Sequence, residues 1–405
     1  MRTVHFLLAL VVVMMTCACA EKELKPIHGS KGKPGKVEII EQEAIPGGVV
    51  VVYRIPESED ILSVVAQYTL TNGKNYKSEA SYFENTLTIA GFNDHTKEYT
   101  AQLFTVNRAQ QRSDPVTVTF RPEESSLSKT ARSMEITADW GGSRFSWINE
   151  DKQPLIFEFF APDEEGNFRI MRVLGSTLAS TSYVLRGYEP KPQRFATVIR
   201  DYWDNVTDTI YPPGGKLTPW LEQKPDKSKM RVMGLGEPNT PNGDAGWNMW
   251  GSNPGYMLND ISNQFGEWEP IPASATFDLG VTLKLSRLVH FHRIGSDFPN
   301  PLERGNPKRY EIYGYYGGGV PSQSGNWSEW TLIMEHEEML PASGGKTSAE
   351  RTPEDMDFVR EYGQTCEIPL TAEPTRYLRI KVLQTWGNTR FASITRLDFY
   401  GEIQK

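Results

Sequence analysis

The sequence predicts an all-β chain of three consecutive β-sheet domains that follow an N-terminal targeting segment. Short stretches of alternating apolar and polar residues recur along the chain, most of them bounded by Gly, Pro or Asn, which is typical of half-buried antiparallel strands. The chain contains 34 Gly and 27 Pro among 405 residues, and long helical periodicity is scarce, so a loop-rich β protein fits better than a helical one. This length is sufficient for two to four domains with ordinary apolar cores.

The charge balance argues against nucleic acid as a partner. The formal net charge is -8 at pH 7, and the sequence pI is about 5.5. A chain of this charge has no broad cationic surface that could offset the repulsion of phosphates.

Residues 1–19 resemble a bacterial lipoprotein signal peptide. Arg2 is followed by an apolar run over residues 6–15, which is too short to span a bilayer as a permanent helix. Small residues precede Cys19 as in a lipobox, so Cys19 is the expected lipidation site; Cys17, or a cleaved signal without lipid, are the alternatives. Residues 20–36 are polar and rich in Pro, Gly and Lys, and we expect them to form a tether between the anchor and the folded part.

Residues 37–122 are expected to form a first β-sandwich. Turn signals, such as the Asn-Gly step at Asn72 and Gly73, separate short β-branched or aromatic stretches. That density of strands over about ninety residues fits a sandwich of the fibronectin type III or immunoglobulin kind. The expected strands cover residues 37–40, 48–55, 62–69, 86–89, 99–106 and 116–120.

A second copy of this plan is expected over residues 125–212. The stretches TLTIAGF (residues 86–92) and YVLRGY (183–188) both end in Gly and an aromatic residue, and a long alternating strand follows each. An internal repeat of this length implies two copies of one supersecondary plan. Both copies resemble fibronectin type III domains. Trp140 and Trp147 lie near the place of that family's core tryptophan in the second copy, whereas the first copy has no obvious equivalent.

Residues 221–405 carry an ordered series of motifs. An acidic, Trp-bearing turn leads to an FDLG strand and a basic loop; a YEIYG strand, a Trp-x-x-Trp pair (Trp327 and Trp330), the strand RYLRIKV and an FYGE ending follow. This order resembles the discoidin, or factor-five/eight type C, jelly roll, which also serves as a galactose-binding-like carbohydrate module. The resemblance implies a β-sandwich jelly roll that holds its ligand on the loops at one mouth of the barrel.

Three stretches offer the side chains that sugar binding needs, an aromatic face for the pyranose and polar groups for its hydroxyls. They cover residues 246–251, 290–304 and 385–391. We choose Trp386 and Arg390 first, because an aromatic platform beside a guanidinium suits a sugar with acidic or vicinal hydroxyl groups. The full set of expected ligand-binding residues is Trp247, Trp250, His292, Arg293, Arg304, Trp386, Asn388 and Arg390.

Some of these residues have an equally simple structural role. Trp247 and Trp250 stand in a glycine-bounded loop and could be packed plugs as readily as binding residues. His290 and His292 alternate at a strand end, so at least one of them is expected to enter the core, and we expect this of His290. Arg293 is expected to contact ligand, with a surface ion pair as the alternative.

The resemblance also implies a structural Ca²⁺ in the turn after the first strand. Asn259, Asp260 and Asn263 sit at the matching place, but the usual Asp-Gly step is here Asp260-Ile261, so an ordinary polar turn is the favoured alternative. No His-x-x-x-His or Cys-x-x-Cys spacing supports zinc. Cys366 is expected to be a buried structural residue.

The sequence lacks the common catalytic signatures. It has no Gly-x-Ser-x-Gly elbow, phosphate-binding loop or dinucleotide fingerprint. The acidic clusters at residues 163–165 and 335–338 are expected to stay solvated in turns, whereas a glycosidase needs two carboxylates held across a cleft. We therefore expect no enzymatic activity.

The whole plan, an anchor, a tether, two sandwiches and a terminal jelly roll, resembles accessory outer-membrane lipoproteins encoded beside SusC/SusD-type glycan importers in Bacteroidetes. The resemblance implies a cell-surface lipoprotein that binds an oligosaccharide or polysaccharide and works with a SusC/SusD-like transporter complex. The alternative is an adhesion or scaffold lipoprotein whose discoidin-like domain binds a protein. Exposed aromatic residues at the barrel mouth would favour the glycan, and buried tryptophans there would favour the protein partner.

Overall fold

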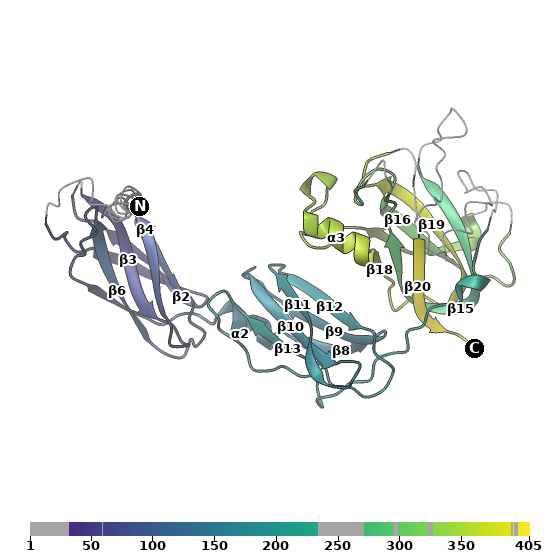
Figure 1. The fold of residues 1–405 in the computed structure, drawn as a ribbon, viewed down its shortest axis with the longest axis horizontal. Coiled ribbons are helices and arrows are strands. Elements are labelled where there is room, and N and C mark those ends of the chain that lie inside the picture. Colours follow the sequence, from purple (N-terminus) through teal and green to yellow (C-terminus); the bar gives the residue numbers. More distant parts are fainter. Residues whose placement is uncertain are drawn as a thin grey trace, which may run out of the picture. The chain divides into compact units, whose positions relative to one another are not determined.

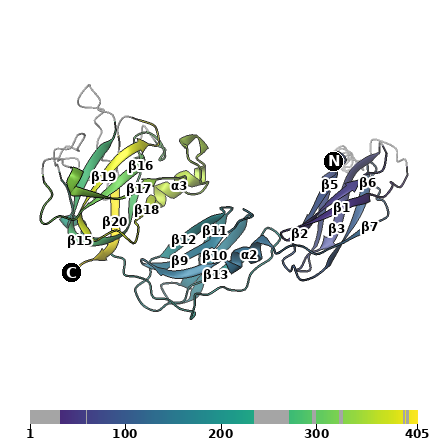
Figure 2. The same ribbon diagram turned by 180° about the vertical axis from the view of Figure 1, so that it is seen from behind.

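The computed structural model describes residues 32–58, 60–233, 271–294, 299–322, 327–389, 392 and 396–405. Antiparallel β-sandwiches make up this part of the chain (Figures 1 and 2), which confirms the predicted all-β fold class. Two α-helices interrupt the strands in the described segments, α2 (Ser126–Arg132) and α3 (Pro353–Tyr362). Within the same segments, no helix is long and apolar enough to cross a membrane.

The first sandwich has two sheets, with the strand orders β1-β2-β5 and β4-β3-β6-β7. Alternation along each strand sends one set of side chains into the space between the sheets, where Val51, Val64 and Phe92 are buried. The strands are β1 (Glu38–Ile45), β2 (Gly48–Arg54), β3 (Ile61–Thr69), β4 (Asn75–Ser81), β5 (Thr86–Ala90), β6 (Tyr99–Asn107) and β7 (Val116–Phe120).

The second sandwich repeats this arrangement with sheets ordered β12-β9-β8 and β11-β10-β13. Trp147 is 1% exposed, and its ring stacks on that of Phe157 with 4.1 Å between centroids, so this tryptophan belongs to the core. The strands are β8 (Glu135–Asp139), β9 (Gly142–Ile148), β10 (Leu155–Pro162), β11 (Phe168–Ser176), β12 (Ser180–Arg186) and β13 (Ala196–Arg200).

The two copies share a glycine turn at the start of their second strand. Gly47 and Gly141 have φ values of 66° and 62°, a left-handed conformation that glycine adopts at little cost. A Cβ on the following residue, Gly48 or Gly142, would collide with a main-chain carbonyl of β5 or β12. The same close approach of two backbones therefore recurs in both sandwiches, as the internal repeat predicts.

The C-terminal domain is built around one 19-residue strand, β15 (Ala273–Phe291). The first part of β15 pairs with β19, and its second part pairs with β18 and β20. The strand thus takes part in pairing with strands of both halves of the domain. The core between them includes Phe277, Leu378 and Phe399. The other elements are η1 (Lys227–Lys229), β14 (Arg231–Met233), β16 (Pro307–Tyr315), η4 (Trp327–Glu329), β17 (Trp330–Glu337), η5 (Ser348–Glu350), β18 (Gln364–Glu367), β19 (Thr375–Thr385) and β20 (Arg396–Ile403).

The Trp-x-x-Trp pair packs around a buried arginine of this domain, and the lone cysteine is buried in its core. The guanidinium carbon of the buried Arg379 lies 4.5 Å from the ring centroid of Trp327 and 4.1 Å from that of Trp330, which stabilises a cation away from water. Cys366 is fully buried, as expected, and this burial raises the pKa of its thiol well above the ordinary value.

Candidate functional site

Three loops meet at one end of the C-terminal sandwich. They follow strands β15, β17 and β19, and main-chain hydrogen bonds join the first to the third: the N–H of Trp386 donates to the carbonyl of Asn306 (2.9 Å), and that of Gly387 donates to the carbonyl of Arg304 (2.8 Å). Ser348, in the loop after β17, places its hydroxyl 2.7 Å from the Leu302 carbonyl and 2.8 Å from that of Trp386. The described parts of the three loops are therefore tied together at their bases.

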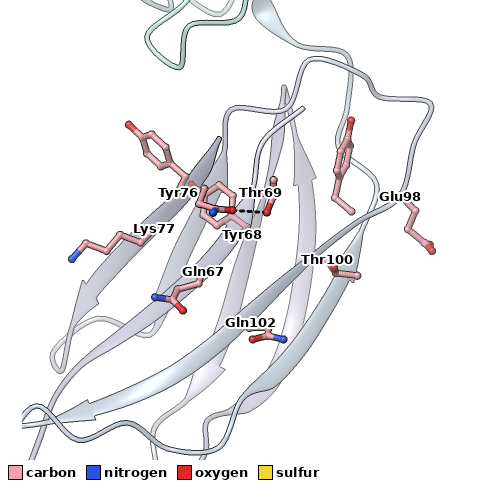
Figure 3. A pocket seen from close by; sticks show the side chains of 10 residues that line it. Gln67, Tyr68, Thr69, Tyr76, Lys77, Glu98, Thr100 and Gln102 are labelled. Carbon is pink, nitrogen blue, oxygen red and sulfur yellow. Dashed lines mark hydrogen bonds between the residues drawn. The ribbon is translucent and has the colours of Figure 1, made fainter. Parts of the chain in front are cut away.

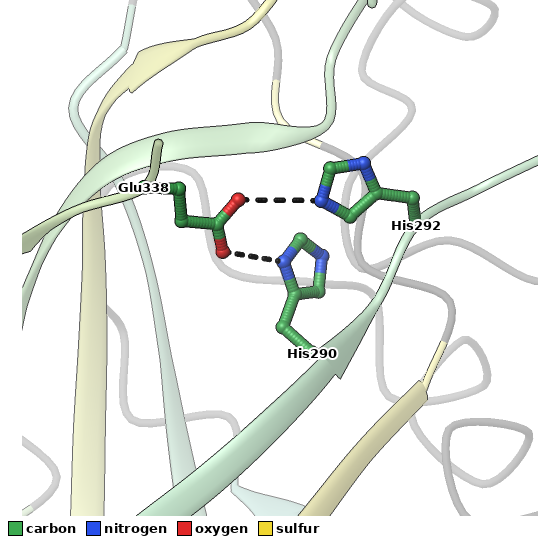
Figure 4. Close-up of side chains that lie close together, drawn as sticks. All are labelled: His290, His292 and Glu338. Atoms are coloured by element: carbon green, nitrogen blue, oxygen red, sulfur yellow. Dashed lines mark hydrogen bonds and ion pairs between the residues drawn. The ribbon is translucent and has the colours of Figure 1, made fainter. Parts of the chain in front are cut away.

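A buried carboxylate lies beneath these loops. Glu338, just after β17, is 2% exposed, and each of its oxygens faces two donors. Oε1 lies 3.2 Å from His290 Nδ1 and 3.3 Å from the Tyr310 hydroxyl, whereas Oε2 lies 3.3 Å from His292 Nε2 and 3.1 Å from Trp386 Nε1. Figure 4 shows the two imidazole rings facing the two carboxylate oxygens. We call these five residues the Glu338 cluster.

The proton positions in the cluster follow from its contacts. The main-chain N–H of Leu302 donates to Nδ1 of His292 over 3.1 Å, so a neutral His292 carries its proton on Nε2 and donates it to Glu338. His290 faces Glu338 through Nδ1, and its Nε2 has no hydrogen-bond partner among the described residues. Both histidines therefore act as donors to one carboxylate.

These hydrogen bonds keep Glu338 ionised in spite of its burial. Desolvation alone would raise the pKa of this carboxyl, but hydrogen bonds from His290 and His292 lower it to about 2. Burial lowers the pKa of His292 and of the neighbouring His336 below the ordinary value, because the charged imidazolium is poorly solvated there. The result is a buried anion held by oriented donors.

The same side chains have the residue types of a metal site. Ligand atoms of His290, His292 and Glu338 all lie within 4.8 Å of one another, and two histidines with one carboxylate can bind Zn²⁺. A ligating histidine, however, offers a lone pair to the metal and donates its other N–H. Nδ1 of His292 instead accepts a hydrogen bond from Leu302. The contacts therefore favour a hydrogen-bonded cluster over a metal centre.

Two residues that were expected to contact ligand are buried in the domain. Trp386 is 4% exposed and His292 is 5% exposed, so the expectation of an exposed aromatic platform at Trp386 is wrong. Both side chains point to Glu338 and pack below the loops. His290 is buried, as expected.

Three other expected residues lie at or near the surface of the loops. Arg304 and Asn388 are exposed, and Arg293 is half-buried. Arg304 and Asn388 both have left-handed backbones, with φ values of 53° and 50°. Gly387, next to Asn388, sits directly against the Arg304 main chain, so the two loops approach each other through their main chains at these positions. We call this exposed surface the Arg304–Asn388 mouth.

The remaining predicted site residues lie outside the described residues. These include the aromatic loop residues and one arginine, the three residues of the expected Ca²⁺ turn, and the lipidated cysteine: Trp247, Trp250, Arg390, Asn259, Asp260, Asn263 and Cys19.

Glu338 is a site residue that the sequence did not predict. The expectation that residues 335–338 stay solvated is wrong for Glu338, because β17 ends at Glu337 and the next side chain turns into the domain. An available signal was the His-x-His alternation at the end of β15: two histidines on one buried face need a polar partner.

The chain is similar in fold to several solved structures. A SusE-like protein is 22% identical over 69% of this chain and all of that chain, with a TM-score of 0.39. The C-terminal domain of a chitobiase from Bacteroides fragilis is 13% identical over 45% of this chain and all of that chain (TM-score 0.28). A GH31 CBM32 domain bound to GalNAc is 13% identical over 45% of this chain and 96% of that chain (TM-score 0.23). At these identities and TM-scores, the likenesses do not extend to function.

No curated protein has a matching sequence. Family models match three successive segments, and each family is described as a domain of unknown function: DUF4959 over residues 34–122, DUF5126 over residues 123–228 and DUF5000 over residues 250–401.

Proposed function

We propose that the chain is a non-enzymatic, cell-surface lipoprotein that binds carbohydrate through the Arg304–Asn388 mouth of its C-terminal domain, as an accessory to glycan uptake. The supporting observation is that two exposed polar residues with left-handed backbones lie on adjoining loops, at the end of the domain where Glu338 is buried and hydrogen-bonded. Residues held in sparsely populated conformations by their surroundings are common at binding sites. The Asn388 carbonyl oxygen accepts a hydrogen bond from Gln384 Nε2 over 3.0 Å, so the guanidinium of Arg304 and the NH₂ group of Asn388 would act as donors to sugar hydroxyl groups.

The location at the outer membrane, facing the cell exterior, rests on the lipobox-like sequence before Cys19. A partnership with a SusC/SusD-like transporter rests on the resemblance in domain plan. Metabolic labelling with palmitate tests the anchor: the label is expected on the native chain and should be lost in Cys19→Ala. Labelling that persists in this variant would show that the lipid is attached at another residue.

Binding to a protein partner is a second candidate, and one observation favours it. Trp386 is buried, so among the described residues of these loops it does not supply the exposed aromatic face that was expected to stack on a sugar. One experiment distinguishes the two candidates, because a carbohydrate site should bind purified glycans without a partner protein.

The experiment is a glycan array followed by calorimetry on the chain from residue 20 onward. Arg304→Gly and Asn388→Gly remove the polar side chains while glycine tolerates the left-handed backbone. Each is expected to weaken binding by ~1–3 kcal/mol. Gln110→Gly is the matched control, since Gln110 is also exposed and left-handed, with a φ of 61°, but lies in the first sandwich. No binding to any glycan, or equal binding by all variants, would overturn the proposal.

A further inference from the structure

The first sandwich exposes its large apolar side chains toward one of its ends. The outer face of the sheet β4-β3-β6-β7 is polar, with Gln67 opposite Gln102 on one side and Lys77 on the other (Figure 3), as is usual for a sheet face in water. Phe83, in contrast, is 94% exposed, which is unfavourable unless another surface covers the ring. The exposed large apolar side chains in the described part of this sandwich are Ile40, Leu62, Tyr82 and Phe83.

Tyr82 and Phe83 occupy the two corners of a tight turn between β4 and β5. The N–H of Glu84 donates to the carbonyl of Ser81 over 3.0 Å, and the Glu84 carboxylate accepts a hydrogen bond from the Ser81 N–H over 3.2 Å. The two rings meet edge to face with 5.6 Å between centroids, and the N–H of Tyr82 donates to the carbonyl of Leu62. Turn corners usually carry Gly, Pro, Asn or Asp, so the turn itself does not require these aromatic residues. We call Leu62, Tyr82 and Phe83 the Phe83 tip.

The N-terminal tether reaches the sandwich at the same end. β3 begins beside the tip with Ile61, which is paired with Asn107 at the end of β6. Asn107 donates from Nδ2 to the carbonyl of Gly32, the first described residue, over 3.1 Å. The Thr105 hydroxyl donates to the carbonyl of Gly35 over 2.6 Å. The last residues of the tether are therefore fixed next to the Phe83 tip.

The chain leaves this sandwich at the opposite end. β7 ends with Phe120, which is paired with Tyr99 at the beginning of β6, whereas the tether contacts the other end of that strand. Roughly a dozen residues separate Gly32 from Cys19, and a flexible segment of this length has a root-mean-square end-to-end distance of about 20 Å. A lipid on Cys19 would therefore hold the Phe83 tip, and not the exit end, near a membrane.

We propose that the Phe83 tip contacts the lipid bilayer that carries the anchor, with the rings of Tyr82 and Phe83 in the headgroup region. This inference rests on the proposed lipidation of Cys19. Aromatic side chains favour the boundary between acyl chains and headgroups. The tether of residues 20–36 has five lysines and two glutamates, a balance that suits anionic headgroups. The contact orients the first sandwich on the membrane, which a flexible tether alone cannot do.

The first test anchors the chain without using Cys19. The chain from residue 20 onward, with an N-terminal hexahistidine tag, is bound to vesicles of phosphatidylethanolamine and phosphatidylglycerol that contain a nickel-chelating lipid. A polarity-sensitive fluorophore on Phe83→Cys should shift its emission to shorter wavelengths and be quenched by nitroxide-labelled lipids. The same fluorophore on His95→Cys, an exposed position between β5 and β6 at the opposite end, should stay unquenched. Cys366 is buried and should not take up the label.

The second test measures the contribution of the native side chain. Cosedimentation of the untagged chain with vesicles that lack the chelating lipid gives its partitioning, and Phe83→Ser should weaken it by about tenfold, because one aromatic ring loses its apolar contact. Phe83→Trp should partition at least as well as the native chain, since tryptophan favours the membrane interface. Leu178→Ser is the matched control: it replaces an apolar side chain that is 50% exposed in the second sandwich and should leave partitioning unchanged.

Equal quenching at positions 83 and 95, or equal partitioning of Phe83→Ser and the native chain, would contradict the membrane contact. Either result would leave the proposed function standing, because glycan binding at the mouth is measured without vesicles and lipidation of Cys19 is measured by palmitate labelling.

Discussion

Trp386 donates its indole N–H to Oε2 of Glu338 over 3.1 Å, and both side chains are nearly inaccessible to solvent. The two residues come from different loops at the same end of the domain, 48 positions apart in the chain. Because the main-chain N–H of Trp386 also donates to the carbonyl of Asn306, this one residue links the buried anion to the loop that carries Arg304. The interior of the domain thus positions the exposed mouth.

Replacing Trp386 by Phe tests this link. The substitution retains an aromatic ring but removes one of the four donors to an ionised carboxylate, which should destabilise the domain by ~1–3 kcal/mol. Differential scanning calorimetry can follow the transition of the C-terminal domain. Tyr316→Phe is the control, because it removes a donor from a side chain that is 40% exposed in the same domain. Equal unfolding temperatures for the two variants would contradict a role for the indole N–H.

Replacing Glu338 by Gln should have a larger effect. A carboxamide has one acceptor oxygen, so it cannot accept four hydrogen bonds, and its NH₂ group would face donors of the cluster. We expect a loss of ~2–5 kcal/mol, because at least two buried donors would lose their acceptor at about 1–3 kcal/mol each. Glu335→Gln makes the same chemical change at an exposed position of β17 and should change stability by less than ~1 kcal/mol.

A similar loss of stability in Glu335→Gln would show that the destabilisation comes from changing a glutamate in or near β17 and not from the Glu338 cluster. Chemical denaturation of both variants, followed by tryptophan fluorescence, provides a second measurement that does not depend on heating.

The stability of the C-terminal domain should fall as the pH falls. The folded pKa of Glu338 is about 2, compared with an ordinary value of 4.5, so below the ordinary value the unfolded chain takes up a proton that the folded domain does not. The contribution of Glu338 is therefore complete above pH 4.5 and is lost as the pH falls toward 2. The lowered pKa of His292 acts in the same direction below its ordinary value of 6.5, because the unfolded chain again binds the proton first.

Calorimetric scans from pH 7.5 to 3.5 should show this decline in the unfolding temperature. Other paired carboxylates, such as Asp278 and Asp398, contribute to the same trend because their pKa values are also lowered. The difference between the native chain and Glu338→Gln isolates the cluster: the gap in unfolding temperature should narrow as the pH approaches the lower end. A gap of constant size would mean that Glu338 is not ionised in the folded domain.

The strands with strong alternation could be predicted from sequence almost to the residue. β6 was expected over residues 99–106 and extends over Tyr99–Asn107. β4 was missed, because its sequence NYKSEAS is almost entirely polar. It forms a strand because it pairs along its whole length with the apolar β3, and such pairing with a distant or stronger partner overrides the weak propensity of the segment.

The candidate site was less predictable for a related reason. A carboxylate within the run EHEE resembles a solvated charge until the donors that surround it are known, and those donors come from the ends of three other strands. The left-handed backbones of Arg304 and Asn388 could not be predicted either, because neither residue is a glycine, the residue type that indicates such a conformation in a sequence. Local sequence indicates strands well, whereas the site depends on contacts between segments far apart in the chain.

Gly387 is the residue whose substitution best tests the packing of the mouth. A Cβ at this position would lie 2.8 Å from the main-chain oxygen of Arg304 and nearer still to its nitrogen and Cα, and backbone atoms cannot move aside as a flexible side chain can. Gly387→Ala should therefore push the two loops apart, at a cost of ~1–3 kcal/mol. Hydrogen exchange of the amide at position 387 should accelerate, because its hydrogen bond to Arg304 would lengthen.

Gly318→Ala is the matched control, since a Cβ there meets no atom within 4 Å. If the mouth binds carbohydrate, Gly387→Ala should also lose affinity in parallel with Arg304→Gly. Native stability and exchange in Gly387→Ala would show that the loops are not held together at this point.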